Sequence, residues 1–132
     1  MPRLDRLSIA LALFLIVASV TPTHAGARVT RAERGYASYY GQGFDSLKTA
    51  SGERFDIRRM TAAHRTLPFG TRLRVTNLRN GLTAIVRVND RGPFVKGRVV
   101  DVSYAAARRL RMIDHGVERV RLEVLPKTAP SS

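Results

Sequence analysis

The chain has 132 residues but no cysteine, no tryptophan and only three histidines. Without cysteine it can form no disulfide, and it cannot carry the lipid that bacterial lipoproteins attach to a cysteine at their cleavage site. Packing and hydrogen bonds alone must therefore hold the fold. The few histidines give little support to a zinc site, and the phosphate-binding spacing of glycine and lysine is missing. We expect no metal and no cofactor.

Acidic residues are also scarce, with 10 against 23 lysines and arginines, and the formal net charge is +13. A field of this strength favours polyanionic partners. Nucleic acid is one candidate class. Carboxylate-bearing wall polymers and phosphorylated envelope glycolipids are another. A basic surface that is simply solvated is the third interpretation, because net charge concerns association rather than fold.

Long apolar runs are absent except for one of 14 residues, Leu7 to Val20. Arg3 and Arg6 precede it, and the small residues of THAGA, 23–27, follow it. This pattern predicts a secretory signal peptide at residues 1–25; an uncleaved N-terminal anchor is the alternative. We therefore expect a periplasmic or secreted protein of the bacterial envelope, with no stable membrane anchor after cleavage. Nucleic acid is not an expected partner.

The remainder has room for one small domain. We predict a flexible lead-in at 26–34, a domain at 35–125 and a disordered tail at 126–132, which is rich in proline, serine and threonine. A chain of this size can fold around one core. We expect a monomer, although no sequence feature sets the oligomeric state.

Strand patterns dominate the domain. The expected strands are 36–40, 72–77, 82–90, 98–102 and 119–124. Asn80-Gly81 predicts a type I′ hairpin turn, in which both residues have positive φ. One helix is expected over Tyr104 to Met112 with Ser103 as its N-cap, and a shorter helical turn after Met60. Short strands with one small helix predict a compact, mainly β barrel.

Asp90 breaks the pattern of its strand. Val86, Val88 and Asp90 share one parity, which in a half-buried strand faces the core. The pattern thus places a carboxylate where an apolar side chain is expected. Asp90 has an ordinary interpretation as well, in which it accepts hydrogen bonds within a turn.

Four other polar residues stand among apolar or turn-forming neighbours, and each also has an ordinary interpretation. Glu53 and Asp56 flank a turn that contains glycine, and turns are often acidic. His64 can be a hydrogen-bonded structural histidine. Asp101 can face the positive N-terminus of the helix that follows. None of these residues is a strong signal alone.

Together the motifs resemble a known family. ASYYG (37–41), TASGERFD (49–56), TAAHRTLPFGT (61–71), VRVNDRGPF (86–94) and GRVVDVS (97–103) occur in the order of the rare lipoprotein A family. The resemblance runs from about Gly35 to Val124. It implies a small six-stranded double-psi β-barrel with one or two short helices. It also implies a lytic transglycosylase, which cuts the β-1,4 bond between N-acetylmuramic acid and N-acetylglucosamine and leaves a 1,6-anhydro end.

The resemblance also implies site residues. The catalytic aspartate falls on Asp90, and supporting catalytic residues fall on Glu53, Asp56 and His64. Asp101 is similar to a second aspartate that lines the cleft of such barrels. On the substrate side we further expect four residues: Arg91, Tyr39, Tyr40 and Phe94.

A single carboxyl suffices for this chemistry, since the C6 hydroxyl of the substrate replaces water as the nucleophile. The carboxyl protonates the leaving oxygen and then accepts the C6 proton, so it must start protonated; burial or nearby carboxylates favour that form. The sequence departs from the family in lacking a lipid-bearing cysteine and in ending seven residues after Leu125, without the glycan-binding SPOR domain of many members. A non-catalytic, expansin-like peptidoglycan-binding module remains the alternative.

Overall fold

The computed structural model describes residues 31–127. The predicted signal peptide at 1–25 lies outside the described residues, as do 26–30 and the last five residues of the predicted tail. Within the described part, no helix is long and apolar enough to cross a membrane.

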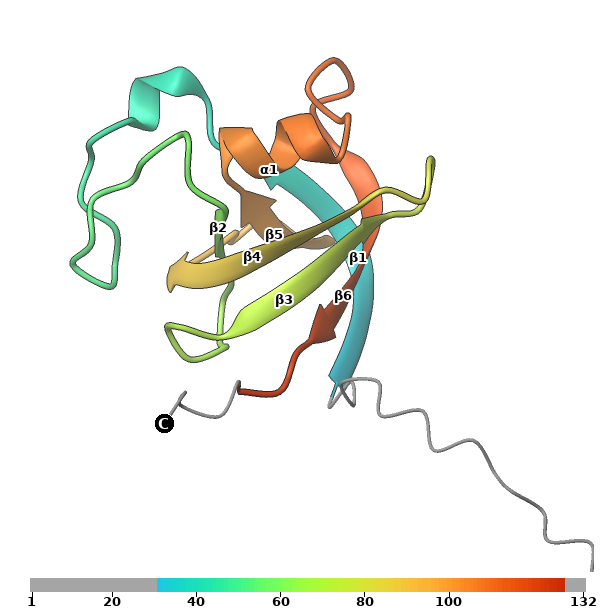
Figure 1. Cartoon of the computed structure of the whole chain (residues 1–132), viewed down its shortest axis with the longest axis horizontal. Helices are drawn as coiled ribbons and strands as arrows, with labels where there is room; N and C mark the ends of the chain where they lie inside the picture. Colours follow the sequence, from blue (N-terminus) through green and yellow to red (C-terminus); the bar gives the residue numbers. More distant parts are fainter. Residues whose placement is uncertain (1–30, 128–132) are drawn as a thin grey trace, which may run out of the picture.

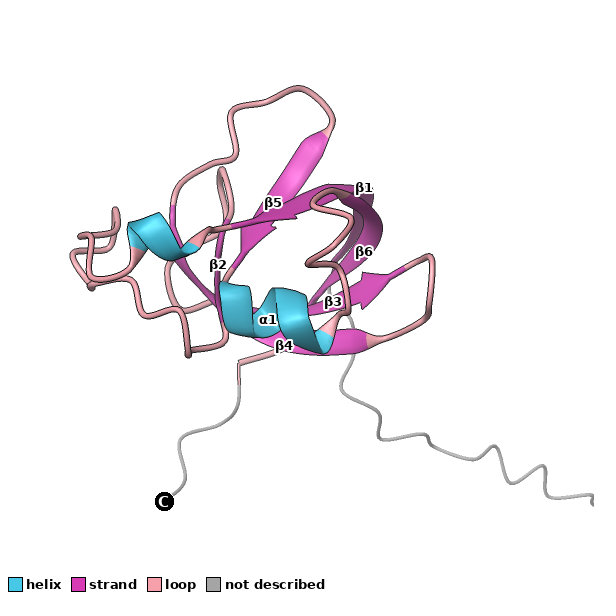
Figure 2. Cartoon of the chain, turned by 90° about the horizontal axis from the view of Figure 1, so that it is seen from above, coloured by secondary structure: helices cyan, strands magenta, loops and turns pink. Residues whose placement is uncertain are grey.

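Six strands close into a barrel, which confirms the predicted fold class (Figures 1 and 2). They are β1 (Arg31–Tyr39), β2 (Thr61–Ala63), β3 (Arg72–Asn77), β4 (Thr83–Asp90), β5 (Arg98–Val102) and β6 (Glu118–Val124). The order around the barrel is β1-β5-β2-β4-β3-β6, so β1 stands three places from β4. The β1–β5 and β2–β4 pairs are parallel, and the other four pairs are antiparallel.

Apolar residues of alternate parity fill the barrel, as the strand patterns predict. Leu73 and Val75 of β3 and Val86 and Val88 of β4 are at most 1% exposed. Val100, Val102, Val120 and Leu122 extend the same core from β5 and β6. The core thus depends on β-branched and leucine side chains, which suit a narrow barrel interior.

Helix α1 (Tyr104–Arg109) packs across one end of the barrel (Figure 2). Ser103 is its N-cap, as predicted, and its hydroxyl accepts a hydrogen bond from the Ala106 amide. The helix ends before the predicted Met112, because the backbone turns into the left-handed region at Arg111, with φ of 51°. Met112 instead packs in the core with no exposed surface. A single 3-10 turn, η1 (Gln42–Phe44), lies in the loop after β1.

The helical turn predicted after Met60 is wrong, because Thr61–Ala63 forms β2. This strand pairs with β4 on one side and β5 on the other, and all three residues are buried. Two alanines carry little strand preference of their own. Hydrogen bonds to both neighbours override the local preference.

Two further expectations need correction. Strand β1 begins at Arg31, because residues 31–34 pair with β6, so the domain boundary predicted at 35 falls inside a strand. The hairpin after β3 is present, but of its two predicted positive-φ residues only Gly81 has one, 75°. The Asn77 amide donates to Leu82, and the Gly81 amide donates to Asn77, which makes a longer loop than a type I′ turn.

Strand β4 loses its alternation at its end, where Asp90 lies. Ala62 of β2 pairs with Val88, but the next residue, Ala63, pairs with Asp90. Asn89 is thus one extra residue in β4, which is the geometry of a β-bulge. Asn89 is buried, while Asp90 is only partly buried. The prediction that Asp90 simply faces the core is therefore wrong: the bulge turns the end of β4 towards the loop that follows β1.

Candidate active site

The side chain of Asp90 is held at the end of β4 by three hydrogen bonds. Its Oδ1 accepts from the backbone amides of Ala50 and Arg91, each at 2.9 Å. Its Oδ2 accepts from the Tyr40 hydroxyl, also at 2.9 Å. The two oxygens therefore differ, since Oδ1 has two fixed backbone donors and Oδ2 has one rotatable hydroxyl.

Tyr40 follows the end of β1, and its ring is wedged between two phenylalanines. The ring centroids of Phe55 and Phe44 lie 5.0 and 5.6 Å away. Burial and the hydrogen bond to Asp90 raise the pKa of Tyr40 far above its ordinary value of 10.0. The hydroxyl thus keeps its proton and serves Asp90 as a donor.

A hollow of about 110 Å³ opens beside this pair. Its lining comprises Tyr40, Phe44, Leu47, Lys48, Thr49, Phe55 and Asp90. All of these residues except Asp90 come from the long loop between β1 and β2. One carboxylate and one lysine thus stand among aromatic and aliphatic side chains in this hollow.

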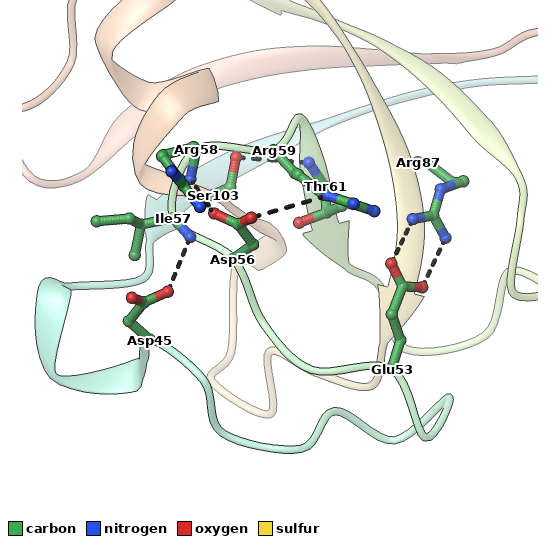
Figure 3. A network of polar contacts seen from close by, with 9 residues as sticks. All are labelled: Asp45, Glu53, Asp56, Ile57, Arg58, Arg59, Thr61, Arg87 and Ser103. Carbon is green, nitrogen blue, oxygen red and sulfur yellow. Dashed lines mark hydrogen bonds and ion pairs between the residues drawn. The ribbon is translucent and has the colours of Figure 1, made fainter.

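Glu53 forms a two-pronged ion pair with Arg87 of β4 (Figure 3). The two N–O distances are 2.9 and 2.6 Å. The hydrogen bonds from Arg87 hold the pKa of Glu53 below its ordinary value of 4.5, and Glu53 in turn raises the pKa of Arg87. Glu53 therefore favours its ionised form. Its ion pair with Arg87 fixes the loop to β4, the strand that ends at Asp90.

Asp56 lies in a different hollow from Asp90. A second hollow, of about 380 Å³, contains both Glu53 and Asp56, and Phe55 lines both hollows. Asp56 accepts hydrogen bonds from the backbone and side chain of Arg58, which lower its pKa (Figure 3). Glu53 and Asp56 thus share one hollow and Asp90 opens on the neighbouring one.

His64 is buried and fully engaged in local contacts. Its Nδ1 accepts from the amides of Thr66 and Leu67, each at 3.2 Å, and its Nε2 lies 3.3 Å from Glu33 Oε2. Two donors at Nδ1 place the ring proton on Nε2, so the ring donates to Glu33. The link from His64 to Asp90 is through the backbone, where the His64 amide donates to the Asp90 carbonyl at 3.2 Å.

Arg91 connects the Asp90 turn to the loop after β2. Its guanidinium donates to the carbonyls of His64 and Leu67 at 3.2 and 2.8 Å, and lies 4.0 Å from the centre of the Phe69 ring. Its backbone amide is one of the donors to Asp90. The side chain of Arg91 thus fixes the turn from which Asp90 projects.

The other expected residues occupy three different places. Asp101 of β5 pairs with Arg98, and its negative charge contributes to raising the pKa of Tyr40. Tyr39 points away from Tyr40, and its hydroxyl donates to the Ile113 carbonyl at 2.9 Å. Phe94 is 80% exposed. The structure therefore places Tyr40 and Asp101 near Asp90, while Tyr39 joins the core.

The backbone amide of Ala50 and the supporting role of Arg87 were not predicted from the sequence. Thr49 shapes the loop that carries Ala50, because its hydroxyl donates to the Glu53 carbonyl at 2.6 Å. Gly52 completes that turn with φ of 89°. The Thr-Ala-Ser-Gly string is a turn signal in the sequence, but only the fold shows which carboxylate its amide reaches.

No group of three or more metal-binding side chains is present between residues 31 and 127. The carboxylates around Asp90 are instead paired with arginines or bound to backbone amides. Proton transfer by a positioned carboxyl and hydroxyl is the chemistry that this arrangement can support.

The closed six-stranded barrel of mixed strand direction is that of a double-psi β-barrel, with a carboxylate at its mouth. The model of the family described as lytic transglycolase matches residues 32–122. The chain belongs to this family, which confirms the resemblance seen in its motifs.

Three relatives illustrate the similarity. The chain is 52% identical over 117 residues to the probable endolytic peptidoglycan transglycosylase RlpA of Synechocystis, covering 89% of this chain and 36% of the relative. It is 58% identical over 92 residues to that of Aquifex aeolicus, covering 70% and 41%. It is 48% identical over 99 residues to the endolytic peptidoglycan transglycosylase RlpA of Vibrio cholerae, covering 75% and 38%. The chain spans about a third to two fifths of the length of these curated relatives.

Two solved structures share the fold. The Streptomyces papain inhibitor superposes with a TM-score of 0.61 at 23% identity, over 76% of this chain and all of that one. A point mutant of the Clavibacter michiganensis expansin, in complex with cellohexaose, gives 0.61 at 21% identity, over 77% and 54%. At these identities the likeness concerns the fold alone.

Proposed function

We propose that this chain is a lytic transglycosylase that cleaves the glycan strands of peptidoglycan, with Asp90 as its one acid and base. The observation that carries the proposal is the asymmetric support of Asp90, with two backbone amides on Oδ1 and the Tyr40 hydroxyl on Oδ2. The family and the names of the relatives supply the substrate class.

The first step is protonation of the leaving oxygen. Because Oδ1 already accepts hydrogen bonds from two backbone amides, the protonated form of Asp90 carries its proton on Oδ2. Oδ2 gives this proton to the glycosidic oxygen as the bond between that oxygen and C1 of N-acetylmuramic acid breaks. The developing oxocarbenium-like charge at C1 is stabilised by the nearby carboxylate that remains.

The second step closes the anhydro ring. The C6 hydroxyl of the same sugar attacks C1, and its proton passes to Oδ2 of Asp90, which restores the starting acid. No water is consumed, and the products are a free 4-hydroxyl on N-acetylglucosamine and a 1,6-anhydro end. Tyr40 holds the intermediate carboxylate by donating to Oδ2, and its O–H bond rotates away when Oδ2 is protonated, while its ring stays in place.

Glu53, Asp56, His64 and Asp101 support this centre in the proposal. Glu53 anchors the loop that carries the Ala50 donor, through its pair with Arg87. Glu53 and Asp56 face the second hollow, where they are available to hydroxyl or amide groups of the strand. His64 and Arg91 keep the Asp90 turn in place, and Asp101 adds negative charge near Tyr40. Phe94, the most exposed of the large apolar side chains, is proposed as a contact for the sugar chain.

We further propose that the protein acts outside the cytoplasm, in the cell envelope. The relatives are named for their action on peptidoglycan, and the apolar run at residues 7–20 has the pattern of an export signal. The measurement is the N-terminal sequence of the protein recovered from the periplasm or medium, with loss of residues 1–25 expected.

The test of activity is product release from purified, peptide-free glycan strands. Wild-type protein is expected to release fragments with 1,6-anhydro ends, identified by mass, while Asp90→Asn releases none and keeps its thermal midpoint. Reducing ends in place of anhydro ends would make the protein a hydrolase.

A non-catalytic, expansin-like binding module is the second candidate, and the formal net charge of +13 favours it, because binding to a polyanionic wall polymer needs no catalytic carboxyl. In that case wild-type and Asp90→Asn proteins bind glycan equally and release nothing. The same digestion therefore separates the two functions.

A further inference from the structure

Four arginines gather on the outer face of the barrel away from Asp90. They are Arg34 of β1, Arg74 of β3, and Arg119 and Arg121 of β6, and we call this set the basic wall. In β3 and β6 the neighbours of opposite parity, such as Val75, Val120 and Leu122, are buried, and Arg34 of β1 is itself exposed. The basic wall therefore faces outward.

The strand register places these charges side by side. Arg34 stands directly opposite Arg121, and Arg119 stands opposite Tyr36, one place along the same face. Side chains opposite each other in an antiparallel pair lie roughly 5 Å apart at Cβ, where like charges destabilise the pair. A pair of like charges that destabilises the sheet in this way is expected where a bound anion offsets the repulsion.

One acid does not neutralise the basic wall. Glu123 accepts from Arg121 at 3.1 Å and from Arg74 at 3.4 Å. Among the outward residues of β1, β3 and β6 it is the one acidic side chain, against five arginines, which are Arg72 and the four of the basic wall. Arg34 and Arg119 have no acidic partner within the described strands, and both are exposed. Tyr36, 45% exposed beside them, adds an aromatic surface of the kind enriched at interfaces.

The basic wall is separate from the candidate active site. The hollow beside Asp90 is lined by the loop after β1 and by Asp90 itself, and none of the four arginines of the basic wall contributes to it. In Figure 1, β1 and β6 run along one side of the barrel, and the long loop between β1 and β2 extends from the other. A polymer contact on the basic wall is therefore a different contact from one in the hollow beside Asp90.

We propose that the basic wall is a second docking surface for peptidoglycan, and that it binds carboxylates of a neighbouring strand. This rests on the proposed function, which makes peptidoglycan the substrate; its free stem-peptide carboxylates are anions repeated along the polymer. Contact with two strands keeps the protein on the polymer between cuts, because the second binding event occurs at high local concentration.

The test is co-sedimentation with purified, insoluble peptidoglycan over a range of NaCl concentrations. All variants carry Asp90→Asn, so that no strand is cut. Arg34→Gln/Arg119→Gln is compared with Arg108→Gln/Arg109→Gln, which removes the same charge from two exposed residues at the end of α1. Arg34→Lys/Arg119→Lys keeps the charge, and thermal midpoints establish that each variant is folded.

We expect Arg34→Gln/Arg119→Gln to bind about tenfold more weakly at low salt, with a shallower salt dependence. The lysine variant and the α1 control should stay within about twofold of the parent. Equal weakening by both glutamine pairs would mean that only net charge matters, and would overturn the proposal. Binding unchanged by the loss of Arg34 and Arg119 would also overturn it.

Vesicles of phosphatidylglycerol and phosphatidylethanolamine form the second arm. Tighter binding to vesicles than to peptidoglycan, lost in Arg34→Gln/Arg119→Gln, would assign the surface to lipid phosphates and overturn the proposal. Failure of the wild-type protein to release anhydro products would instead count against the proposed activity. The two failures are distinguishable, because binding is measured in protein that cannot cut.

Discussion

Asp90 owes its environment to one extra residue in β4. The bulge at Asn89 buries that amide side chain and turns Asp90 to the loop after β1. There the carboxylate accepts hydrogen bonds from two backbone amides and from the hydroxyl of Tyr40. In the proposed mechanism, the difference between its two oxygens, rather than its depth in the protein, decides which of them carries the transferred proton.

Tyr40→Phe tests this difference. The variant keeps the contacts of the ring with Phe44 and Phe55 but removes the donor to Oδ2. We expect kcat on glycan strands to fall about tenfold with little change in KM, since a hydrogen bond to a charged group contributes roughly 1.5 kcal/mol or more.

Tyr39→Phe is the matched control for Tyr40→Phe. It removes a hydroxyl that donates to Ile113 on the core side of β1, so it should lower the thermal midpoint and leave kcat unchanged. Equal loss of kcat in both variants would contradict a specific role of Tyr40. A mass-based assay of anhydro ends measures both.

At the scale of elements, the parallel pair β1–β5 is unusually close at Gly35. A Cβ there would overlap a methyl group of Val99 and lie 3.2 Å from the Gly97 carbonyl. The pair also changes register between Tyr36 and Ala37. The close approach of these two strands thus depends on the absence of a side chain at Gly35.

Gly35→Ala should therefore destabilise the barrel by about 1–3 kcal/mol, measured by urea denaturation. Gly43→Ala in η1 is the control, because its Cβ would meet no atom within 4 Å. Adding Val99→Ala to Gly35→Ala should recover part of the loss, as expected for two residues in contact. Equal stability of the Gly35 and Gly43 variants would contradict the close approach.

Elements with a strong local pattern could be predicted from sequence. Strands β3 and β5 have the expected bounds, and Ser103 caps α1. Strand β2 could not be predicted, because its stability comes from two neighbours distant in the chain. The bulge at Asn89 also arises from pairing, so alternation alone assigned Asp90 to the wrong environment.

The candidate site, too, could be predicted from the sequence only in part. Motifs identified the residue types around Asp90 and their approximate positions. They could not show which partner each side chain chooses: Glu53 pairs with Arg87, and His64 with Glu33. Likewise, the neighbouring Tyr39 and Tyr40 point in opposite directions. The sequence alone does not show which of the two hydroxyls reaches Asp90.

For the whole molecule, the excess of arginine gives several of the described acids a basic partner. The pKa of Glu53 is held below 4.5 by Arg87, and that of Asp56 below its ordinary 3.8 by Arg58. A carboxyl whose pKa is lower in the folded state stabilises the fold at pH values above its unfolded-state pKa. This stabilisation is lost as the pH falls through the folded-state pKa. Protonation also exposes the repulsion among the arginines.

We therefore expect the thermal midpoint to fall as the pH drops below ~4.5, with added salt reducing the loss. Glu53→Gln should lower the midpoint at neutral pH by the equivalent of at most about 1 kcal/mol, since its pair with Arg87 is partly exposed. The variant should also respond less to acid. A wild-type midpoint independent of pH in this range would contradict the linkage.

The closure of the barrel has a consequence for folding speed. The closing pair is β1–β6, where Arg31 meets Val124, whereas β3 and β4 form a hairpin from neighbouring segments. Contacts between distant segments slow folding, so times of milliseconds to seconds are expected, as for other β-barrels. The hairpin is the natural early structure and the β1–β6 seam the late one. Stopped-flow refolding of Gly35→Ala should then show faster unfolding with little change in the refolding rate.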